Sequence, residues 1–382
     1  MADKGGLEGI VVARSRLCSI DGLKGVLIYG GYDVGDLAEH SSYEEVCFLT
    51  LRGRLPTADE LDAFTADLSA ARALSAETAS VIDMLAGHAA PMEMLRTAVS
   101  ADSFDDPDKS SDEEQANFRK ATRLIAKMPT MVARYDRRRR GLEPIEPDPS
   151  LGHAANFLWM LSGGRPDAQA AKTFDVALIL HADHEMNAST FTARVIASTL
   201  SDMHSAITGA IGALKGPLHG GANEQVMHLL AEIGGDQNIE QEIRERLDRK
   251  QRIMGFGHRV YKTHDPRAVI LKRFSRSLAE RSAEPHWFAI SEQIEKAVLE
   301  EKGLYPNVDF YSASTYHYLG IETGLFTPIF AMSRVVGWAA HVIEQHADNR
   351  LIRPSSEYIG PVPRVYRPIE QRGALDAASP VG

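Results

Sequence analysis

The sequence has few of the features that mark secreted or membrane proteins. Cysteine occurs only as Cys18 and Cys47 in 382 residues, which is too few for a disulfide framework and is typical of a reducing compartment. No uninterrupted apolar run approaches the roughly 18 residues of a membrane helix. The first residues, Met-Ala-Asp-Lys-Gly-Gly, lack the apolar stretch of a signal peptide. We therefore expect a soluble, cytoplasmic protein with no membrane partner.

The chain also has fewer positively charged than negatively charged residues. The chain has 42 Lys and Arg residues against 52 Asp and Glu residues, a net charge of −10, which argues against a nucleic-acid partner. An acidic total does not exclude small anionic ligands, because a buried pocket has its own local field. A chain of this length is expected to form about two domains.

Strand-like sequence is confined to the N-terminal region. Apolar segments at 10–12 and 26–29 lie on either side of the turn dipeptide Asp21-Gly22, which predicts a β-hairpin. Elsewhere strand and helix patterns do not alternate, so we expect no parallel sheet. The stretch from about Gly373 is small and polar and is predicted to be mobile.

Helical patterns cover most of the chain. Ser or Thr followed three residues later by Glu, the spacing of a capping box, occurs at 42–45, 57–60 and 111–114. The helix after the third box is predicted to end at Pro129, and the acidic, Ser-rich stretch 102–115 is predicted to be a surface loop. Further helices are predicted at about 151–161, 222–233, 267–281, 286–301 and 328–346. The sequence therefore predicts an all-α protein with a small N-terminal β-hairpin.

Histidines beside glycines suggest where chemistry takes place. His181 and His184 are three residues apart, on one face of a predicted helix, and are either packing residues or ligands. His219 lies in a glycine-rich turn before a helix that starts near Ala222, where free amides favour a neutral imidazole or an anionic ligand. A simple helix-capping role for His219 stays open.

The segment Gly255-Phe256-Gly257-His258-Arg259 has no third glycine and no preceding strand, so it is not a dinucleotide-binding fingerprint. Its amides and Arg259 are nevertheless suited to an anionic ligand.

An acid and several arginines complete the pattern. Asp309 lies at a loop-to-helix boundary, where a helix N-cap is the alternative role. Arg334 lies in an apolar helix and needs a partner, for which a ligand carboxylate is one candidate. Neutral imidazoles, one carboxylate and several guanidinium groups together indicate a site for a small polycarboxylate.

Across nearly its whole length the chain resembles the citrate synthase family. Seven blocks carry the resemblance, in the order and approximate spacing of that family. They are H-A-D-H-E-x-N-A-S-T at 181–190, G-P-L-H-G-G-A-N-E at 216–224, G-F-G-H-R at 255–259, D-P-R at 265–267, N-V-D at 307–309, S-R at 333–334 and R-P at 353–354.

The resemblance implies a fold and an activity. The fold is an almost entirely helical homodimer, with a large domain formed by 1–221 and 321–382 and a small mobile domain formed by 222–320. The activity is the condensation of acetyl-CoA with oxaloacetate and water to give citrate and CoA. Acetyl-CoA is a substrate, and the resemblance implies neither a cofactor nor a metal.

The resemblance also implies roles for individual residues. Asp309 matches the base that removes a methyl proton, His219 the donor to the thioester oxygen, and His258 the donor to the oxaloacetate ketone. The residues that match the oxaloacetate site are His184, Arg267, Arg334 and Arg353 (the last from the other subunit), with Arg72 as a further candidate. The residues that match the CoA site are Gly255, Phe256, Gly257, His258 and Arg259, with Lys302 as a further candidate.

Three alternatives stay open. The first is 2-methylcitrate synthase, which uses propionyl-CoA; its members often have Y-A-E-H-E where this chain has His181-Ala182-Asp183, a difference that favours acetyl-CoA. The second is a helical zinc hydrolase that uses His181, His184 and a distant carboxylate. The third is a catalytically inactive dimer that binds CoA or a partner.

Overall fold

The structure is a computed structural model that describes residues 6–7, 9–234, 238–360 and 365–372. Its contacts divide the chain into two units, Met1–Arg350 and Leu351–Gly382. The predicted mobile tail from Gly373 lies outside the described residues.

The first unit begins with a small antiparallel sheet in the order β1-β2-β3. Its strands are Cys18–Asp21 (β1), Val26–Tyr29 (β2) and Tyr32–Asp33 (β3). The second strand of the predicted hairpin is confirmed, but the first is wrong. Ile10 and Val11 are 62% and 86% exposed and form no strand. They have no core to cover, whereas β1 pairs with β2, whose Leu27 and Tyr29 are buried.

Helices make up the rest of this unit, so the all-α prediction is confirmed. In the described residues they are α1 (Val34–His40), α2 (Tyr43–Arg52), α3 (Ala58–Ala70), α4 (Ala76–Leu85), α5 (Pro91–Asp102), α6 (Glu114–Arg139), α7 (His153–Ser162), α8 (Ala168–His181), α9 (Ala188–Ala197), α10 (Met203–Leu214), α11 (Ala222–Ile233), α12 (Ile239–Asp248), α13 (Pro266–Ala279), α14 (His286–Lys302), α15 (Val308–Tyr318) and α16 (Phe326–Ala347). Short 3₁₀-helices at Ser103–Asp105 and Thr323–Leu325 precede α6 and α16.

Two of the three predicted caps are confirmed. Ser42 caps α2, and Thr57 forms a full capping box with Glu60 at the start of α3. The third is wrong, because α6 begins at Glu114 and its cap position makes no side-chain hydrogen bond. Such caps satisfy amides at the first turn that have no partner within the helix.

Pro129 does not end its helix as predicted, because α6 continues for ten residues beyond it. A proline inside a helix removes one backbone hydrogen bond and crowds the preceding turn. On either side of Pro129, α6 is buried almost continuously between Leu124 and Tyr135. Packing on both sides of the proline outweighs the local loss.

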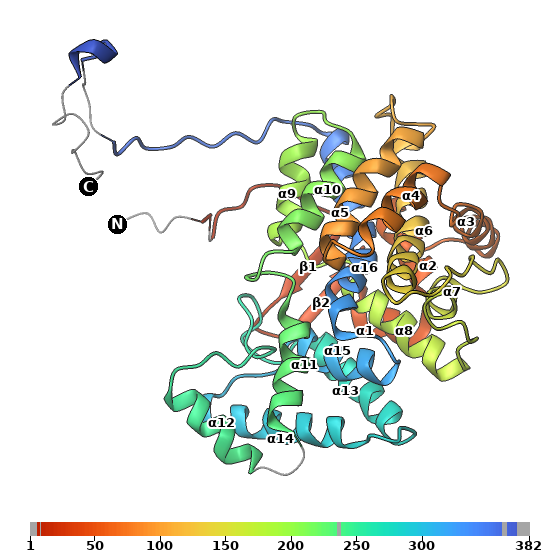
Figure 1. Cartoon of the computed structure of the whole chain (residues 1–382), viewed down its shortest axis with the longest axis vertical. Coiled ribbons are helices and arrows are strands. Elements are labelled where there is room, and N and C mark those ends of the chain that lie inside the picture. Colours follow the sequence, from red (N-terminus) through yellow and green to blue (C-terminus); the bar gives the residue numbers. More distant parts are fainter. Residues whose placement is uncertain (1–5, 8, 235–237, 361–364, 373–382) are drawn as a thin grey trace. The chain divides into compact units, whose positions relative to one another are not determined.

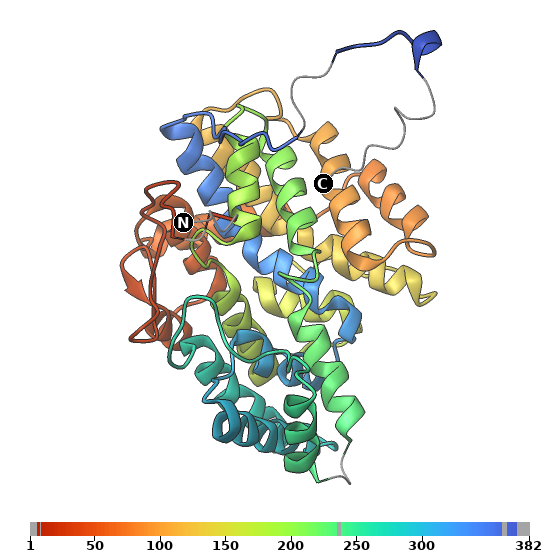
Figure 2. The ribbon, with the colours of Figure 1, turned by 90° about the vertical axis from the view of Figure 1, so that its left-hand side faces the viewer.

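The helix α16 runs through the middle of this unit, between α6 on one side and α9 and α10 on the other (Figures 1 and 2). All of its residues from Phe326 to Val342 are buried. Among the described residues, the stretch Thr323–Ala347 is long and apolar enough to cross a membrane, but 94% of its most apolar window is buried inside the protein. It is the central core helix of the fold.

The helices α11 to α15 lie together at one end of the unit (Figures 1 and 2). Among them, α13 packs on α15, α11 on α15 and α12 on α14. They cover most of the segment 222–320, whose role as a separate mobile domain stays a prediction.

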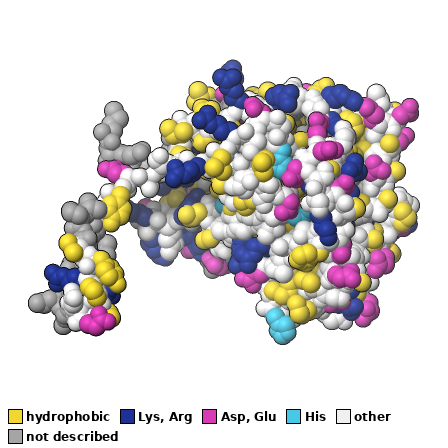
Figure 3. Space-filling view, turned by 90° about the horizontal axis from the view of Figure 1, so that it is seen from above, with side chains coloured by type: hydrophobic (Ala, Val, Ile, Leu, Met, Phe, Trp, Pro, Cys, Tyr) yellow, Lys and Arg dark blue, Asp and Glu magenta, His cyan; other side chains and the backbone are white. Residues whose placement is uncertain are grey.

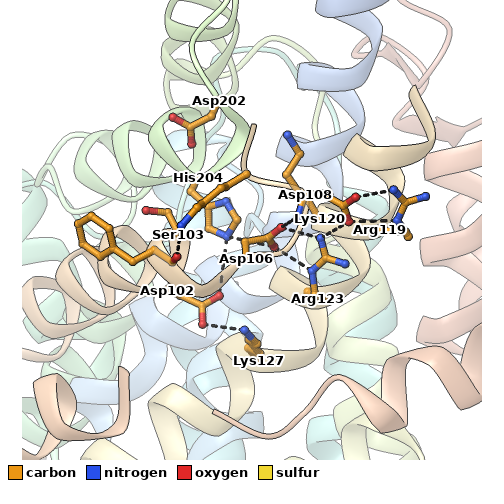
Figure 4. Close-up of polar contacts among 12 residues, drawn as sticks. Asp102, Ser103, Asp106, Asp108, Arg119, Lys120, Arg123, Lys127, Asp202 and His204 are labelled. Atoms are coloured by element: carbon orange, nitrogen blue, oxygen red, sulfur yellow. Dashed lines mark hydrogen bonds and ion pairs between the residues drawn. The ribbon is translucent and has the colours of Figure 1, made fainter. Parts of the chain in front are cut away.

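The stretch 102–115 is less exposed than predicted, because Asp102 and Asp106 are fully buried. Figure 4 shows the reason: basic side chains of α6 point into this stretch. Lys127 Nζ lies 2.8 Å from Asp102 Oδ1, and Arg123 forms two hydrogen bonds with Asp106. Paired in this way, the carboxylates are tolerated in the interior. On the face shown in Figure 3, basic and acidic side chains of the described residues are intermixed.

The second unit contains one short 3₁₀-helix, Ile369–Gln371, and otherwise irregular backbone in its described residues. Within it, the Arg372 guanidinium lies over the ring of Tyr366, 5.4 Å from the centroid. Arg353 is exposed.

Candidate active site

One cavity of about 610 Å³ gathers most of the predicted site residues. It lies between the loop after α8, the turn before α11, the loop before α13, the start of α15 and one face of α16. Its size is in the range of small-molecule sites. The predicted residues that line it are His184, His219, Phe256, Gly257, His258, Arg259, Arg267, Asp309 and Arg334.

His219 contacts the first turn of α9 rather than capping α11. The Ser189 amide donates to His219 Nε2 at 3.3 Å, and Ser189 Oγ lies 2.8 Å from the same nitrogen. Because Nε2 accepts from an amide, we assign the imidazole proton to Nδ1. Burial, followed by Arg334, lowers the pKa of His219 to about 4. The ring is therefore neutral near pH 7.

His258 is oriented by its own loop. The amides of Val260 and Tyr261 donate to His258 Nδ1 at 3.0 and 3.2 Å. With Nδ1 accepting both bonds, the proton of the neutral ring lies on Nε2. Burial, followed by Arg267, lowers the pKa of His258 to about 4. His258 can therefore donate one hydrogen bond while staying uncharged.

His184 lies beyond the end of α8, so the prediction that it shares a helix face with His181 is wrong. His181 is the last residue of α8; its Nδ1 lies 2.7 Å from the Ala177 carbonyl, and its ring meets Phe330 edge-on. The ring of His184 lies 5.1 Å from that of His258. Burial lowers the pKa of His184 well below its usual value. Its buried Nε2 has no hydrogen-bond partner in the described part of the chain and is free to contact a ligand.

Asp309 is not the N-cap of α15, because Asn307 caps this helix and accepts from the Asp309 amide at 3.0 Å. Asp309 lies in the first turn and faces the cavity. Burial raises its pKa to about 6, although Arg267 and Arg334 oppose the rise. Among the described residues, its buried Oδ1 has no hydrogen-bond partner. A partly desolvated carboxylate that is ionised near pH 7 is suited to act as a base.

Arg267 is held in place by a carboxylate that we did not single out from the sequence. Asp265 caps α13 and accepts from Nε and Nη2 of Arg267 at 3.0 and 2.8 Å. Its Oδ2 also accepts from the Val308 amide at 3.1 Å. Asp265 therefore fixes a buried guanidinium and connects the starts of α13 and α15, and it compensates the buried positive charge.

Arg334 projects from α16 with part of its hydrogen-bonding capacity unused. Its Nε donates to the His181 carbonyl at 2.5 Å, and its guanidinium lies 4.7 Å from the centre of the Phe330 ring. Its Nη2 is buried and has no hydrogen-bond partner in the described residues. A buried guanidinium with a free N–H is suited to bind a ligand carboxylate.

The loop at 255–259 is fixed by backbone contacts with 305–307. Phe256 forms an isolated bridge with Pro306, and Asn307 Nδ2 donates to the Gly257 carbonyl at 3.0 Å. Gly255 has φ of +83°, and a Cβ there would lie 2.7 Å from Val226 Cγ2 and 2.9 Å from Phe310 Cδ2. Only glycine allows this approach without strain.

Three candidates of the first unit, Gly255, Lys302 and Arg72, do not line the cavity. Lys302 is the exposed last residue of α14, and Arg353 belongs to the second unit. Arg72 is buried, and its Nη1 donates to the Asp148 carbonyl at 3.0 Å. The contacts of Arg72 are those of a residue that supports the structure.

Two polar residues of the site, Ser189 and Asp265, were not predicted from the sequence, although both lie inside the blocks that carry the resemblance. Their spacing along the chain does not reveal that they contact His219 and Arg267. No group of three His, Cys, Asp or Glu side chains in the described residues is arranged to hold a metal ion.

Fold and cavity together define a helical enzyme suited to acid–base chemistry on a small, negatively charged substrate. The family model for the citrate synthase C-terminal domain matches residues 6–355. The citrate synthase of Haloferax volcanii is 52% identical over 376 residues, 97% of this chain and 99% of that protein. Citrate synthase 2 of Bacillus subtilis is 50% identical over 371 residues, 96% of this chain and 98% of that protein. The 2-methylcitrate synthase of Mycobacterium tuberculosis is 44% identical over 362 residues, 95% of this chain and 92% of that protein.

Solved structures agree with these relatives. The citrate synthase of Pyrobaculum aerophilum is similar with a TM-score of 0.91 and 46% identity, covering 96% of this chain and 94% of that one. The Thermoplasma acidophilum citrate synthase, solved as a ternary complex with carboxymethyl coenzyme A and oxaloacetate, is similar with a TM-score of 0.90 and 36% identity, covering 95% of this chain and 98% of that one. The chain belongs to the citrate synthase family.

Proposed function

We propose that this chain is a citrate synthase that condenses acetyl-CoA with oxaloacetate and water to give citrate and CoA. The observation that carries the proposal is the convergence of Asp309, His219 and His258 on one cavity beside two buried arginines. Support also comes from the 52% and 50% identical relatives, which are named citrate synthases, and from the ligands of the Thermoplasma ternary complex.

In the first step, Asp309 removes a proton from the methyl group of acetyl-CoA. Its raised pKa makes it a stronger base than an exposed aspartate while leaving it ionised at neutral pH. The Nδ1–H of His219 donates to the thioester oxygen, on which negative charge develops as the enol forms. A neutral imidazole acts here as a hydrogen-bond donor, as our proton assignment for His219 allows.

In the second step, the methylene carbon of the enol attacks the ketone carbon of oxaloacetate. The Nε2–H of His258 donates to the ketone oxygen and stabilises the alkoxide that develops there. The carbon–carbon bond forms, and the product is the CoA thioester of citrate. Water then attacks the thioester carbonyl, the carbon–sulfur bond breaks, and citrate and CoA leave.

Oxaloacetate is held by its carboxylates. Arg267 and Arg334 supply buried guanidinium groups, and the free Nε2 of His184 supplies a further polar contact. We propose that the site is completed in a homodimer by Arg353 of the second subunit. The segment 222–320 closes over oxaloacetate as a mobile domain, and the loop 255–259 then receives CoA.

The test is thiol release by the purified protein from acetyl-CoA and from propionyl-CoA, with and without oxaloacetate. We expect release that depends on oxaloacetate, with kcat/KM favouring acetyl-CoA by at least about tenfold, the lower end of discrimination over one methylene. A ratio near one, or a reversed ratio, would favour 2-methylcitrate synthase, a name carried by a 44% identical relative. Absence of turnover with both thioesters would contradict the proposal and favour a protein that only binds CoA.

A further inference from the structure

The turn of the N-terminal hairpin lies directly against the loop that carries His258. The Lys262 amide donates to the Gly22 carbonyl at 2.8 Å. A Cβ at Gly22 would lie 2.3 Å from the Val260 carbonyl oxygen and 2.8 Å from its carbon. Two backbones are therefore in contact, and even the smallest side chain at Gly22 would displace one of them.

A second glycine in the turn makes a similar approach. Gly25 has φ of +68°, and a Cβ there would lie 2.7 Å from the His264 carbonyl oxygen. Between the two glycines, Leu23 is 79% exposed. The backbone of the turn thus contacts the loop at both ends of the turn, at Gly22 and at Gly25.

The loop has few other anchors along this stretch. Its start is fixed by the bonds of Gly257 to 305–307, and its end by Asp265 at the start of α13. Within the described residues between them, the bond from Lys262 to Gly22 is the one backbone hydrogen bond to another part of the chain. The buried ring of Tyr261, which packs against His184 and Arg267, anchors the side-chain side of this stretch, and the turn anchors its backbone.

The same stretch orients the imidazole of His258. The amides of Val260 and Tyr261 donate to His258 Nδ1, and Val260 is also the residue that abuts Gly22. A displaced Val260 would misdirect these two amides, and with them the ring of His258, which lines the cavity.

We propose that the hairpin turn is a positioning element for the active site, and that Gly22 is its positioning residue. It holds the stretch 258–262 so that Val260 and Tyr261 aim His258 at the substrate ketone. The turn lies in the segment predicted for the large domain and the loop in the segment predicted for the small one, so this contact connects the two. The proposal rests on the proposed function for the role of His258, but not for the contact itself.

The test compares Gly22→Ala with Leu23→Ala, a matched control in the same turn. We expect Gly22→Ala to lower kcat/KM by about 10- to 10²-fold, the range expected when a reacting group is misplaced by up to about 1 Å. The imidazole nitrogen NMR spectrum of His258 should lose the pattern of an accepting Nδ1 and a protonated Nε2. Leu23→Ala should match the wild type in both. A folded Gly22→Ala protein with wild-type kinetics and spectrum would overturn the proposal.

A measurement on the wild-type protein covers the case in which Gly22→Ala does not fold. With oxaloacetate present, the Lys262 amide should exchange its hydrogen at least about tenfold more slowly than a free peptide amide, because it is bonded to Gly22. Exchange at the free rate would show that the contact does not form in solution. This outcome is independent of turnover, so it is distinguishable from a failure of the proposed function.

Discussion

The Nε2 atom of His219 lies 2.8 Å from the Oγ atom of Ser189, and that hydroxyl accepts a hydrogen bond from the indole of Trp338 at 3.1 Å. A chain of polar contacts thus runs from the central helix α16 through the start of α9 to the imidazole. Since the Ser189 amide also donates to the ring, the contacts favour one neutral form of His219, with its proton on Nδ1.

Removing the hydroxyl should weaken catalysis without removing a group that contacts substrate. For Ser189→Ala we expect kcat to fall by about tenfold or more, since a contact that orients the hydrogen-bond donor His219 is lost. The amide of residue 189 stays, so the ring should remain neutral. Steady-state kinetics provide the measurement, with Ser205→Ala, an exposed serine on α10, as control. Unchanged kcat would show that Ser189 does not position His219.

The pH dependence of the reaction should follow Asp309. Its pKa is raised to about 6, and the base acts only when ionised, so kcat/KM should be constant above about pH 7 and fall tenfold per unit below about pH 6. His219 and His258, with pKa values lowered to about 4, should cause no further change of kcat/KM in this pH range. A pH–rate profile from pH 5 to 9 tests this. If the fall of kcat/KM at low pH had the same midpoint in a residually active Asp309→Glu protein, the base would be a different residue.

Replacing Asp309 with Asn should lower the activity of the protein and raise its stability. Turnover should fall by at least about 10²-fold, because the proton acceptor is gone, while oxaloacetate binding should barely change.

The stability effect has a definite sign. The folded-state pKa of Asp309 lies above its ordinary value of 3.8, so its contribution to stability is full at low pH and is lost as the pH rises through about 6. Asn should therefore raise the free energy of unfolding by about 1–3 kcal/mol at pH 8, and by roughly half as much at pH 5. Urea unfolding at both pH values measures this. A destabilised Asn protein at pH 8 would contradict the proposed desolvation.

If the site spans two subunits, activity should be recoverable by mixing. Arg353→Ala and Asp309→Asn should each be nearly inactive alone. In a mixed dimer, one of the two sites combines the intact Asp309 of one subunit with the intact Arg353 of the other, so activity should return. Subunit exchange verified by native mass spectrometry, followed by the thiol assay, tests this. Verified hybrids without activity would remove Arg353 from the partner's site.

The buried ion pair of Figure 4 predicts a large effect on stability. Burial raises the pKa of Asp102, but the contacts with His204 and Lys127 outweigh burial and lower this pKa below its usual range. Lys127→Met leaves this carboxylate buried without its cation, so we expect a loss of about 3–5 kcal/mol at pH 7.

Arg119→Met is the control, because Arg119 is more than half exposed where it pairs with Asp108, and should cost less than about 1 kcal/mol. Because the folded pKa of Asp102 is depressed, the contribution of the pair should be present above the unfolded pKa and disappear as the pH falls through the folded one. Equal losses in the two variants would show that burial does not set the strength of the pair.

Local features of the chain could be predicted from sequence because they depend on neighbouring residues. The Ser42 and Thr57 caps and the spacing of apolar residues in α16 are decided within one or two helical turns. The same holds for the blocks at 181–190, 216–224 and 255–259, which identify the family by local sequence. Pro129 and Ile10–Val12 were predicted wrongly because burial on both sides of α6, and exposure of the N-terminal segment, are properties of the whole fold.

The amino-acid sequence thus determined the helical class, the family and the types of side chain available for chemistry. Only the tertiary structure decided which of these side chains lie close together. Ser189 and His219 are 30 residues apart, and His184 and Arg334 reach the cavity of Asp309 from different helices and loops. The raised pKa of Asp309 and the neutral state of the histidines arise from desolvation, which depends on everything packed around a group and not on its neighbours in the chain.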